Sequence, residues 1–337
     1  MRQGAVLCLT LVLLVLISVI SVGGCAEKQA DEQISRTRLL LDTLCTITAF
    51  GDFESGELES IIDDAFDYIE ELEALFSITL DGSDVWRINH AGGEPVAVDE
   101  RTIEVIKAGL EFGEISDGMF DITIGRASRL WDFSGEPRVP FEAELEEALA
   151  TVDFRQVIID GNTVQLKNSD ARIDLGAIAK GYMAYKTGEF LAGRGVSGAL
   201  VDLGGDVVAV GNRQDGNPWR IALREPFGGA DDWLGVIEVS WASVMASGTY
   251  ERQFEIDGVR YHHILDPNTG KPVISDVISA TVITETGMVG EGLSTLAVLL
   301  GSEKVSELFE GFQGFMGAVL VLENGRLLEL GDVRFID

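Results

Sequence analysis

The stretch "GALVDLGGDVVAVG", from Gly198 to Gly211, decides which kind of sheet we expect. Apolar and β-branched residues on both sides of Gly204-Gly205 are typical of a strand, so the stretch predicts one strand broken by a double glycine. Glycine inside a strand lowers stability and usually marks a bulge or the close approach of another backbone or a ligand. A structural and a ligand-related role for the two glycines therefore both stay open.

The neighbouring segments predict more strands, several of which follow one another without a helix between them. Asp257-Gly258 and Asn324-Gly325 each lie between two apolar runs, as in β-hairpins. A doubly wound parallel sheet needs regular βαβ spacing, which is missing, so we expect an α+β fold with mixed, largely antiparallel sheets and flanking helices. Expected strands or hairpins are 38–51, 198–211, 219–226, 233–247, 252–265, 277–286 and 316–331; expected helices are 55–77, 99–118, 141–152, 177–191, 287–301 and 302–312.

The N-terminus indicates export. A basic start, "MRQG", precedes an apolar run from Ala5 to Val22, and "VGGC" ends at Cys25. Small residues directly before a cysteine resemble a bacterial lipobox, although a plain transmembrane anchor is the alternative. We expect a lipoprotein signal peptide over 1–24, a polar tether over 25–37 and one folded domain over 38–337. Cys25 would then be acylated, for example with palmitate, and would anchor the protein on the outer face of the bacterial inner membrane.

The charge of the chain excludes one class of partner. With 56 acidic and 25 basic residues the formal net charge is -31, which repels phosphate backbones and excludes nucleic acid. An anionic substrate needs local neutralisation by a metal ion or by main-chain N–H groups. Cys45 is the one cysteine in the folded part, so we expect no internal disulfide there.

Two helix starts contain candidate ligands. "IDLGAIAKGY" (173–182) places Lys180 near the first turn of a helix, where free N–H groups could bind an anion, although such a start is often only structural. Glu291 and Thr295 in "VGEGLSTLAVLL" lie four residues apart and so share one helical face. A carboxylate and a hydroxyl can both coordinate Mg²⁺, but Thr295 bonded to its own helix and Glu291 in solvent is the alternative.

Six blocks in order, "SDVWRIN", "GMFDITIG…LW", "IDLGAIAKGY", "VDLGGDVVAVG", "SGTYERQFEIDGVRYHHILDPNTGKP" and "GEGLSTLAVLLG", resemble the ApbE family of FAD:protein FMN transferases. The resemblance covers roughly residues 38–330. It implies two lobes around a central FAD cleft. It also implies Mg²⁺-dependent transfer of FMN from FAD to a Ser or Thr hydroxyl of another protein, with release of AMP.

The resemblance also implies roles for particular residues. His263 matches the family's histidine and would be the catalytic base, whereas His262 would pack or orient. Glu291, where the family usually has Asp, Thr295 and the carbonyl of Ala177 would bind Mg²⁺. The positions that would line the FAD cleft are Asp121, Asp174, Lys180, Gly204, Gly205, Asp206 and Asp266.

The implied partners are FAD and exported FMN-accepting proteins, such as subunits of Rnf-type or Na⁺-pumping NADH:quinone oxidoreductase complexes, or FMN-binding domain proteins. Two alternatives stay open. One is an FAD pyrophosphatase that uses water as the nucleophile, and the other is a lipoprotein that binds FAD without turnover. A redox enzyme is disfavoured, because the chain has no G-x-G-x-x-G with an acidic residue at the right distance.

Overall fold

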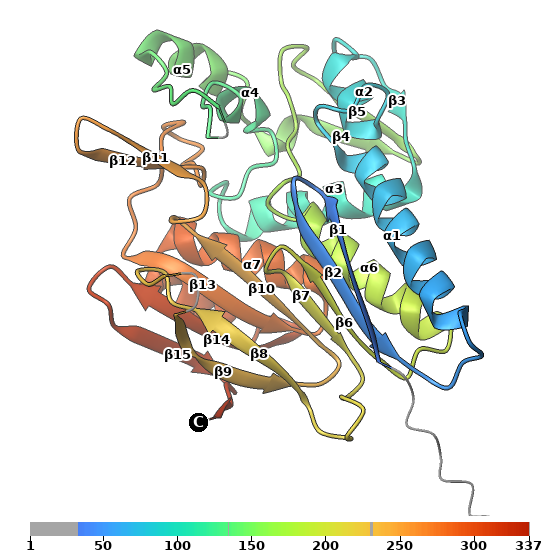
Figure 1. Cartoon of the computed structure of the whole chain (residues 1–337). Helices are drawn as coiled ribbons and strands as arrows, with labels where there is room; N and C mark the ends of the chain where they lie inside the picture. The colour runs from blue at the N-terminus through green and yellow to red at the C-terminus, as the bar shows by residue number, and fades with distance from the viewer. Residues whose placement is uncertain (1–32, 134, 230–231, 337) are drawn as a thin grey trace, which may run out of the picture. The chain divides into compact units, whose positions relative to one another are not determined.

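The computed structural model describes residues 33–133, 135–229 and 232–336. These described residues form one compact unit. At its centre is an eight-stranded sheet in which every neighbouring pair is antiparallel, which confirms the predicted α+β class (Figure 1). In spatial order its strands are β1 (Ile34–Leu40), β2 (Thr43–Phe50), β6 (Gly198–Leu203), β7 (Val207–Val210), β10 (Ala242–Gly248), β13 (Val277–Thr284), β14 (Phe315–Leu322) and β15 (Leu327–Gly331).

Two predicted single strands are hairpins. The stretch 198–211 reverses at Gly204-Gly205, so that β6 and β7 pair with each other. The stretch 38–51 likewise turns at Leu41-Asp42, whose φ angles of 55° and 56° are left-handed. Asn-Gly or Asp-Gly normally indicates such a turn, and with leucine as its first residue the sequence gives no such indication.

The predicted tether over 25–37 was also too long. Residues 34–37 already belong to β1, where they pair with β2. The predicted signal peptide over 1–24 and Cys25 lie outside the described residues. Within the described part of the chain, no helix is long and apolar enough to cross a membrane.

Both faces of the main sheet are covered. Val208 and Val210 of β7 belong to the larger core, on the side of the long helices, whereas Val207 and Ala209 belong to a second core under a three-stranded sheet. Burial on both faces explains why β7 reads as a continuous apolar run rather than an alternating one. The covering elements are α1 (Glu57–Phe76), α6 (Ala179–Gly193), α7 (Gly287–Leu300) and α8 (Ser302–Phe309) on one side, and β8 (Trp219–Arg224), β9 (Trp233–Val239) and β16 (Phe335–Ile336) on the other.

Smaller elements gather at the top of the view in Figure 1. A separate hairpin, β11 (Gln253–Ile256) and β12 (Val259–His262), turns at Asp257-Gly258 as predicted. The remaining elements are α2 (Asp84–His90), α3 (Glu100–Ile115), α4 (Gly125–Ser128), α5 (Glu142–Leu149), a short 3₁₀ helix (Phe154–Gln156), β3 (Val96–Ala97), β4 (Val157–Asp160) and β5 (Thr163–Leu166).

Candidate active site

Two glycines bring the first turns of α6 and α7 together. A Cβ atom on Gly181 would lie 2.3 Å from the carbonyl oxygen of Gly287, and one on Gly287 would lie 2.1 Å from that of Gly181. No side chain fits between the two backbones, so glycine is required at both positions. The contact places Lys180 of α6 next to Glu291 of α7, whose Cβ lies 2.8 Å from the position that a Gly181 Cβ would take.

Lys180 forms an ion pair with Asp206, which follows the Gly204-Gly205 turn. Asp206 is only 1 % exposed, and its Oδ1 accepts a hydrogen bond of 3.0 Å from the backbone N–H of Ala246 in β10. Burial acts to lower the pKa of Lys180, but the charges of Asp206 and Glu291 outweigh it and the pKa is raised. Lys180 therefore stays cationic.

Glu291 is 7 % exposed. Its Oε2 has no hydrogen-bond partner among the residues that the structure describes. Burial, reinforced by the charge of Asp206, raises the pKa of Glu291 well above its usual range, while Lys180 acts in the opposite direction. A buried carboxylate oxygen without a partner is costly, and a bound cation would remove that cost.

Thr295 lies one turn after Glu291 on the same face of α7, as the i, i+4 spacing predicted. Its Oγ1 is 3.2 Å from the hydroxyl of Ser247 in β10, which is also 2.8 Å from the hydroxyl of Ser294. The carbonyl of Ala177 precedes α6 and accepts no backbone hydrogen bond from the described residues. Ala177, Glu291 and Thr295 thus offer three kinds of oxygen that suit Mg²⁺.

The same described residues contain no cluster of three or more His, Cys, Asp or Glu side chains suited to a metal ion.

His263 directly follows β12. Its backbone N–H donates to the carbonyl of Arg252 at 3.1 Å, and its Nδ1 has no partner among the described residues. Burial, together with the charge of Arg252, lowers the pKa of His263 to about 4. The positive charge of Lys180 acts in the same direction and is the smallest of the causes. His263 is therefore neutral at physiological pH and can accept a proton.

The other histidines are engaged elsewhere. His262 is 8 % exposed, and its Nε2 is 3.2 Å from the carbonyl of Val273. Because a carbonyl can only accept, this nitrogen carries the proton. The packing or orienting role expected of His262 stays a prediction. His90 stacks on Trp86, with ring centroids 4.1 Å apart, and its Nδ1 is 2.7 Å from the carbonyl of the same residue.

Two predicted cleft residues, Asp121 and Asp174, form hydrogen bonds within the chain itself. Both carboxylate oxygens of Asp121 accept hydrogen bonds, from Thr123 at 2.5 and 2.7 Å and from the N–H of Phe154 at 3.0 Å. Asp174 accepts from the N–H of Gly176 at 2.9 Å and from Ser128 at 3.1 Å. These contacts fix the loops beside the site, and a direct contact of these carboxylates with FAD stays a prediction.

Asp266 fixes the turn after His263. Its Oδ1 accepts a hydrogen bond of 2.8 Å from the N–H of Asn268, and its carbonyl accepts one of 2.8 Å from the N–H of Gly270. The predicted tight turn over 266–270 is confirmed. A contact between Asp266 and FAD stays a prediction.

The two glycines after β6 differ from each other. A Cβ on Gly204 would lie 2.4 Å from the hydroxyl oxygen of Thr43 in β2, and φ there is 72°. Gly204 therefore has a structural role. Gly205, with φ of 100°, has no atom within 4 Å of where its Cβ would be, so its open side is the part of the turn that a ligand could approach.

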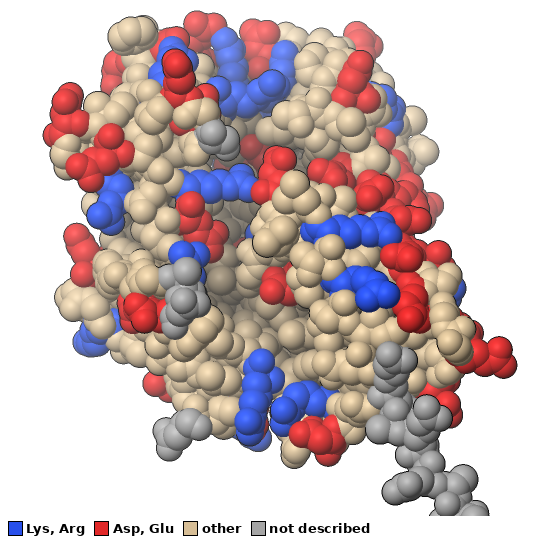
Figure 2. All heavy atoms as spheres, viewed as in Figure 1, with Lys and Arg blue, Asp and Glu red and all other residues tan. Residues whose placement is uncertain are grey.

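The structure brings Lys180, Asp206 and Glu291 together, and Thr295 lies one turn further along α7. Ala177 lies just before α6, and its place in a metal site stays a prediction. Figure 2 shows that this face of the molecule is hollowed near its centre, with acidic and basic side chains around the hollow. Sequence reasoning missed the glycine contact between α6 and α7 and the hydroxyl of Ser247. Neither has a local signal, because both are contacts between residues far apart in the chain.

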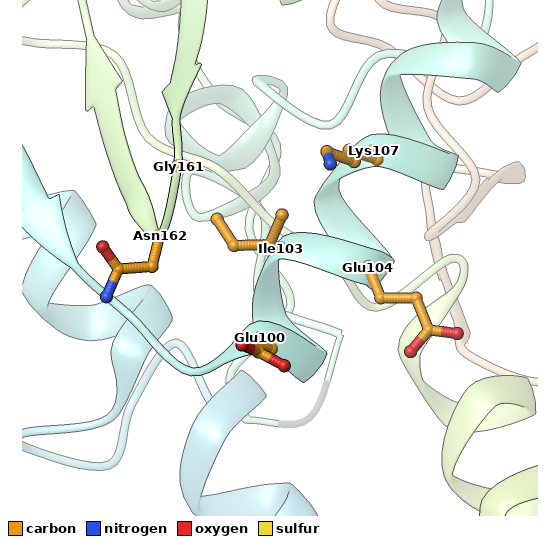
Figure 3. Close-up of a pocket in the computed structure, with 6 residues that line it drawn as sticks. All are labelled: Glu100, Ile103, Glu104, Lys107, Gly161 and Asn162. Atoms are coloured by element: carbon orange, nitrogen blue, oxygen red, sulfur yellow. The ribbon is translucent and has the colours of Figure 1, made fainter.

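Two surface recesses lie among other residues. One, of about 560 Å³, lies between α3 and the β4–β5 turn and is lined by Glu100, Ile103, Glu104, Lys107, Gly161 and Asn162 (Figure 3). Glu104 there already accepts a hydrogen bond of 2.7 Å from the hydroxyl of Tyr182. The other, of about 420 Å³, lies between α3 and the start of α7. Neither recess is lined by any predicted site residue.

Comparison with known proteins decides the family. A profile of the ApbE family matches residues 41–320. The chain belongs to the ApbE family. An FAD:protein FMN transferase from Treponema pallidum is 34 % identical over 310 residues, which cover 87 % of this chain and 86 % of that protein.

Solved ApbE structures have the same fold. The ApbE protein of Thermotoga maritima is 35 % identical with a TM-score of 0.79, over 89 % of this chain and 97 % of that one. The flavin transferase ApbE of Vibrio cholerae is 27 % identical with a TM-score of 0.80, over 91 % of this chain and 100 % of that one. The family predicted from six short blocks is thus confirmed over most of the chain.

Proposed function

We propose that this chain is an FAD:protein FMN transferase that acts on other exported proteins. The observations that carry the proposal are the imidazole of His263, whose Nδ1 has no hydrogen-bond partner among the described residues, and the Lys180–Asp206 ion pair beside the buried Glu291. Family membership supports it, because the relatives that match are named for this activity.

In the proposed reaction, a Ser or Thr oxygen of the acceptor protein bonds to the FMN-side phosphorus of FAD. The bond from that phosphorus to the bridging oxygen breaks, and AMP leaves with that oxygen. The hydroxyl proton passes to His263, and FMN remains on the acceptor through a phosphoester. General-base assistance of this kind is typically worth about 10²–10⁴-fold in rate.

The remaining residues manage charge and position. Lys180, held by Asp206, provides a fixed cation for the phosphate oxygens. Ala177, Glu291 and Thr295 would hold Mg²⁺, which when bound neutralises charge on the pyrophosphate. The partnerless Oε2 of Glu291 fits that ion. Gly205, open on one side, would let the substrate approach the backbone closely.

The proposal also assigns a place in the cell. We infer that Cys25 is acylated after removal of residues 1–24, so the enzyme is anchored outside the cytoplasmic membrane. The lipobox-like "VGGC" supports this inference.

Fluorescence on a denaturing gel tests the function. The full chain is incubated with FAD, Mg²⁺ and a candidate FMN-binding domain, and the gel is viewed under ultraviolet light. A flavin band at the mass of the acceptor supports transfer. Consumption of FAD to free FMN and AMP, with no band even when acceptor is in excess, would instead support the pyrophosphatase.

A further inference from the structure

Four aromatic rings pack around the chain that leads into His263. Phe254 and Tyr261 face each other across the β11–β12 hairpin, with ring centroids 5.4 Å apart. Trp131, in the loop after α4, lies 5.6 Å from Tyr261, and Phe133 lies 5.4 Å from Phe254. The hairpin whose last residue directly precedes His263 is thus packed against this loop.

Trp131 also holds the chain that leaves His263. Its Nε1–H donates a hydrogen bond of 2.8 Å to the carbonyl of Gly270, which ends the turn closed by Asp266. The tryptophan is 6 % exposed, so loss of this donor would leave a carbonyl poorly satisfied. One side chain therefore contacts both the segment before His263 and the segment after it.

The imidazole interacts with the backbone of Arg252, just before β11, and no hydrogen bond joins it to another side chain of the described residues. No hydrogen bond from the described residues reaches its Nδ1. The Phe133 ring stands nearly perpendicular to the imidazole, with the two ring centroids 6.5 Å apart. A ring without a side-chain partner must take its orientation from the backbone on each side and from the surrounding packing. That backbone is what Trp131 fixes.

We propose that Trp131 is a positioning residue, which orients the His263 imidazole by holding the β11–β12 hairpin and the 266–270 turn at the same time. The proposal rests on the proposed function, in which His263 takes the proton of the acceptor hydroxyl. Misplacement of a reacting group by about 1 Å can reduce the rate about 10²-fold, so loss of this support should be visible in the kinetics.

The variant Trp131→Phe keeps an aromatic ring and removes the N–H donor. We expect kcat for FMN transfer to fall by about 10-fold or more, with KM for FAD unchanged, because binding groups are retained while the base is misplaced. Trp219→Phe is the matched control. Trp219 is also 6 % exposed and donates to the carbonyl of Val210 at 3.2 Å, but it lies in the second core. It should lose thermal stability without a fall in kcat.

A second readout does not depend on activity. The chain has three histidines, so their NMR signals can be assigned from His→Gln variants. With a pKa of about 4, the His263 signal should not move between pH 8 and pH 5. In Trp131→Phe, a ring released to water should titrate in this range, towards the ordinary value near 6.5. This readout reports the position of the His263 ring even if the protein transfers no FMN. Failure of the proposed function can therefore be told apart from failure of the role proposed for Trp131.

The proposal is overturned if Trp131→Phe folds, keeps the wild-type kcat and leaves the His263 signal unmoved. It is also overturned if Trp219→Phe reduces kcat to the same extent, since general destabilisation would then explain both. If Trp131→Phe does not fold, Phe254→Leu takes its place. This change loosens the hairpin side of the ring group while keeping the Trp131–Gly270 hydrogen bond, and the same two readouts decide.

Discussion

At the scale of single residues, the account depends most on the unpartnered polar atoms. His263 Nδ1 and Glu291 Oε2 are buried and have no hydrogen-bond partner among the described residues. Such atoms are costly in a folded protein unless a ligand, a water or an ion completes them. In the proposed reaction, these two atoms would serve as the proton acceptor and as a metal ligand.

Replacing His263 by Gln tests the base directly. Gln keeps a hydrogen-bonding group but cannot take a proton, so we expect transfer to fall about 10²-fold or more while FAD and Mg²⁺ binding persist. His262→Ala should reduce transfer much less, because that ring bonds to the chain at Val273. Steady-state kinetics and calorimetric FAD binding provide the measurements. Near-normal transfer by His263→Gln would show that the imidazole only contacts phosphate.

Replacing Glu291 tests the metal site. Glu291→Gln removes the charge, so we expect apparent Mg²⁺ affinity to fall strongly, whereas Glu291→Asp, the usual family residue, should be tolerated. The measurement is the Mg²⁺ concentration needed for half-maximal transfer, together with calorimetric binding of Mn²⁺ in the presence of FAD. Full activity of Glu291→Gln at low Mg²⁺ would remove Glu291 from the ligand set.

At the scale of elements, the crossing of α6 and α7 builds the site. Two backbones in contact at Gly181 and Gly287 place Lys180 and Glu291 side by side. Regular helix periodicity predicted both helices and the shared face of Glu291 and Thr295. It could not predict the contact between Gly181 and Gly287, because the two glycines are more than a hundred residues apart and no local pattern relates them.

Gly181→Ala should therefore damage fold and function together. The added Cβ would lie 2.3 Å from the carbonyl of Gly287, and such overpacking typically costs about 1–3 kcal/mol. We expect a lower Tm and weaker Mg²⁺-dependent transfer. Gly193→Ala is the control, since it lies at the end of the same helix with no atom within 4 Å of its Cβ position. Equal behaviour of the two variants would contradict the role assigned to the crossing.

The residue types at the turns explain which hairpins the sequence predicts and which it does not. Two hairpins have the residue pairs that typically indicate a turn, Asp257-Gly258 and Asn324-Gly325, and both predictions are confirmed. Leu41-Asp42 has two left-handed residues, as Asp257-Gly258 does, but no glycine, so the sequence predicts one strand where β1 and β2 form a hairpin. The double glycine at 204–205 is also a turn rather than a break in a strand, since both residues have positive φ angles and β6 pairs with β7. Thr43 of another hairpin leaves no room for a side chain at Gly204.

At the scale of the whole molecule, the net charge and the proposed lipid anchor determine which substrates and acceptors the enzyme meets. A net charge of -31 repels an anionic substrate except near fixed cations. Lys180 therefore matters more for binding an anionic substrate in this protein than it would in a basic one. The lipid anchor would keep the enzyme beside exported or membrane-bound acceptors.

Cys25→Ala tests the anchor. Without the thiol no acyl chains can be attached, so we expect the variant to remain uncleaved or to leave the membrane fraction. Cell fractionation followed by mass spectrometry of the N-terminus provides the measurement. Processing and membrane association equal to those of the wild type would show that Cys25 is not the anchoring residue.

The intact mass of the acceptor tests the central claim most directly. The full chain, FAD and Mg²⁺ are incubated with an exported FMN-binding domain and with a variant of that domain in which the acceptor Ser or Thr is Ala. The account predicts that the intact domain gains the mass of one FMN less one water, that AMP is released in equal amount, and that the Ala variant gains nothing. Release of AMP and free FMN at the same rate with both domains, and no gain in mass, would contradict it.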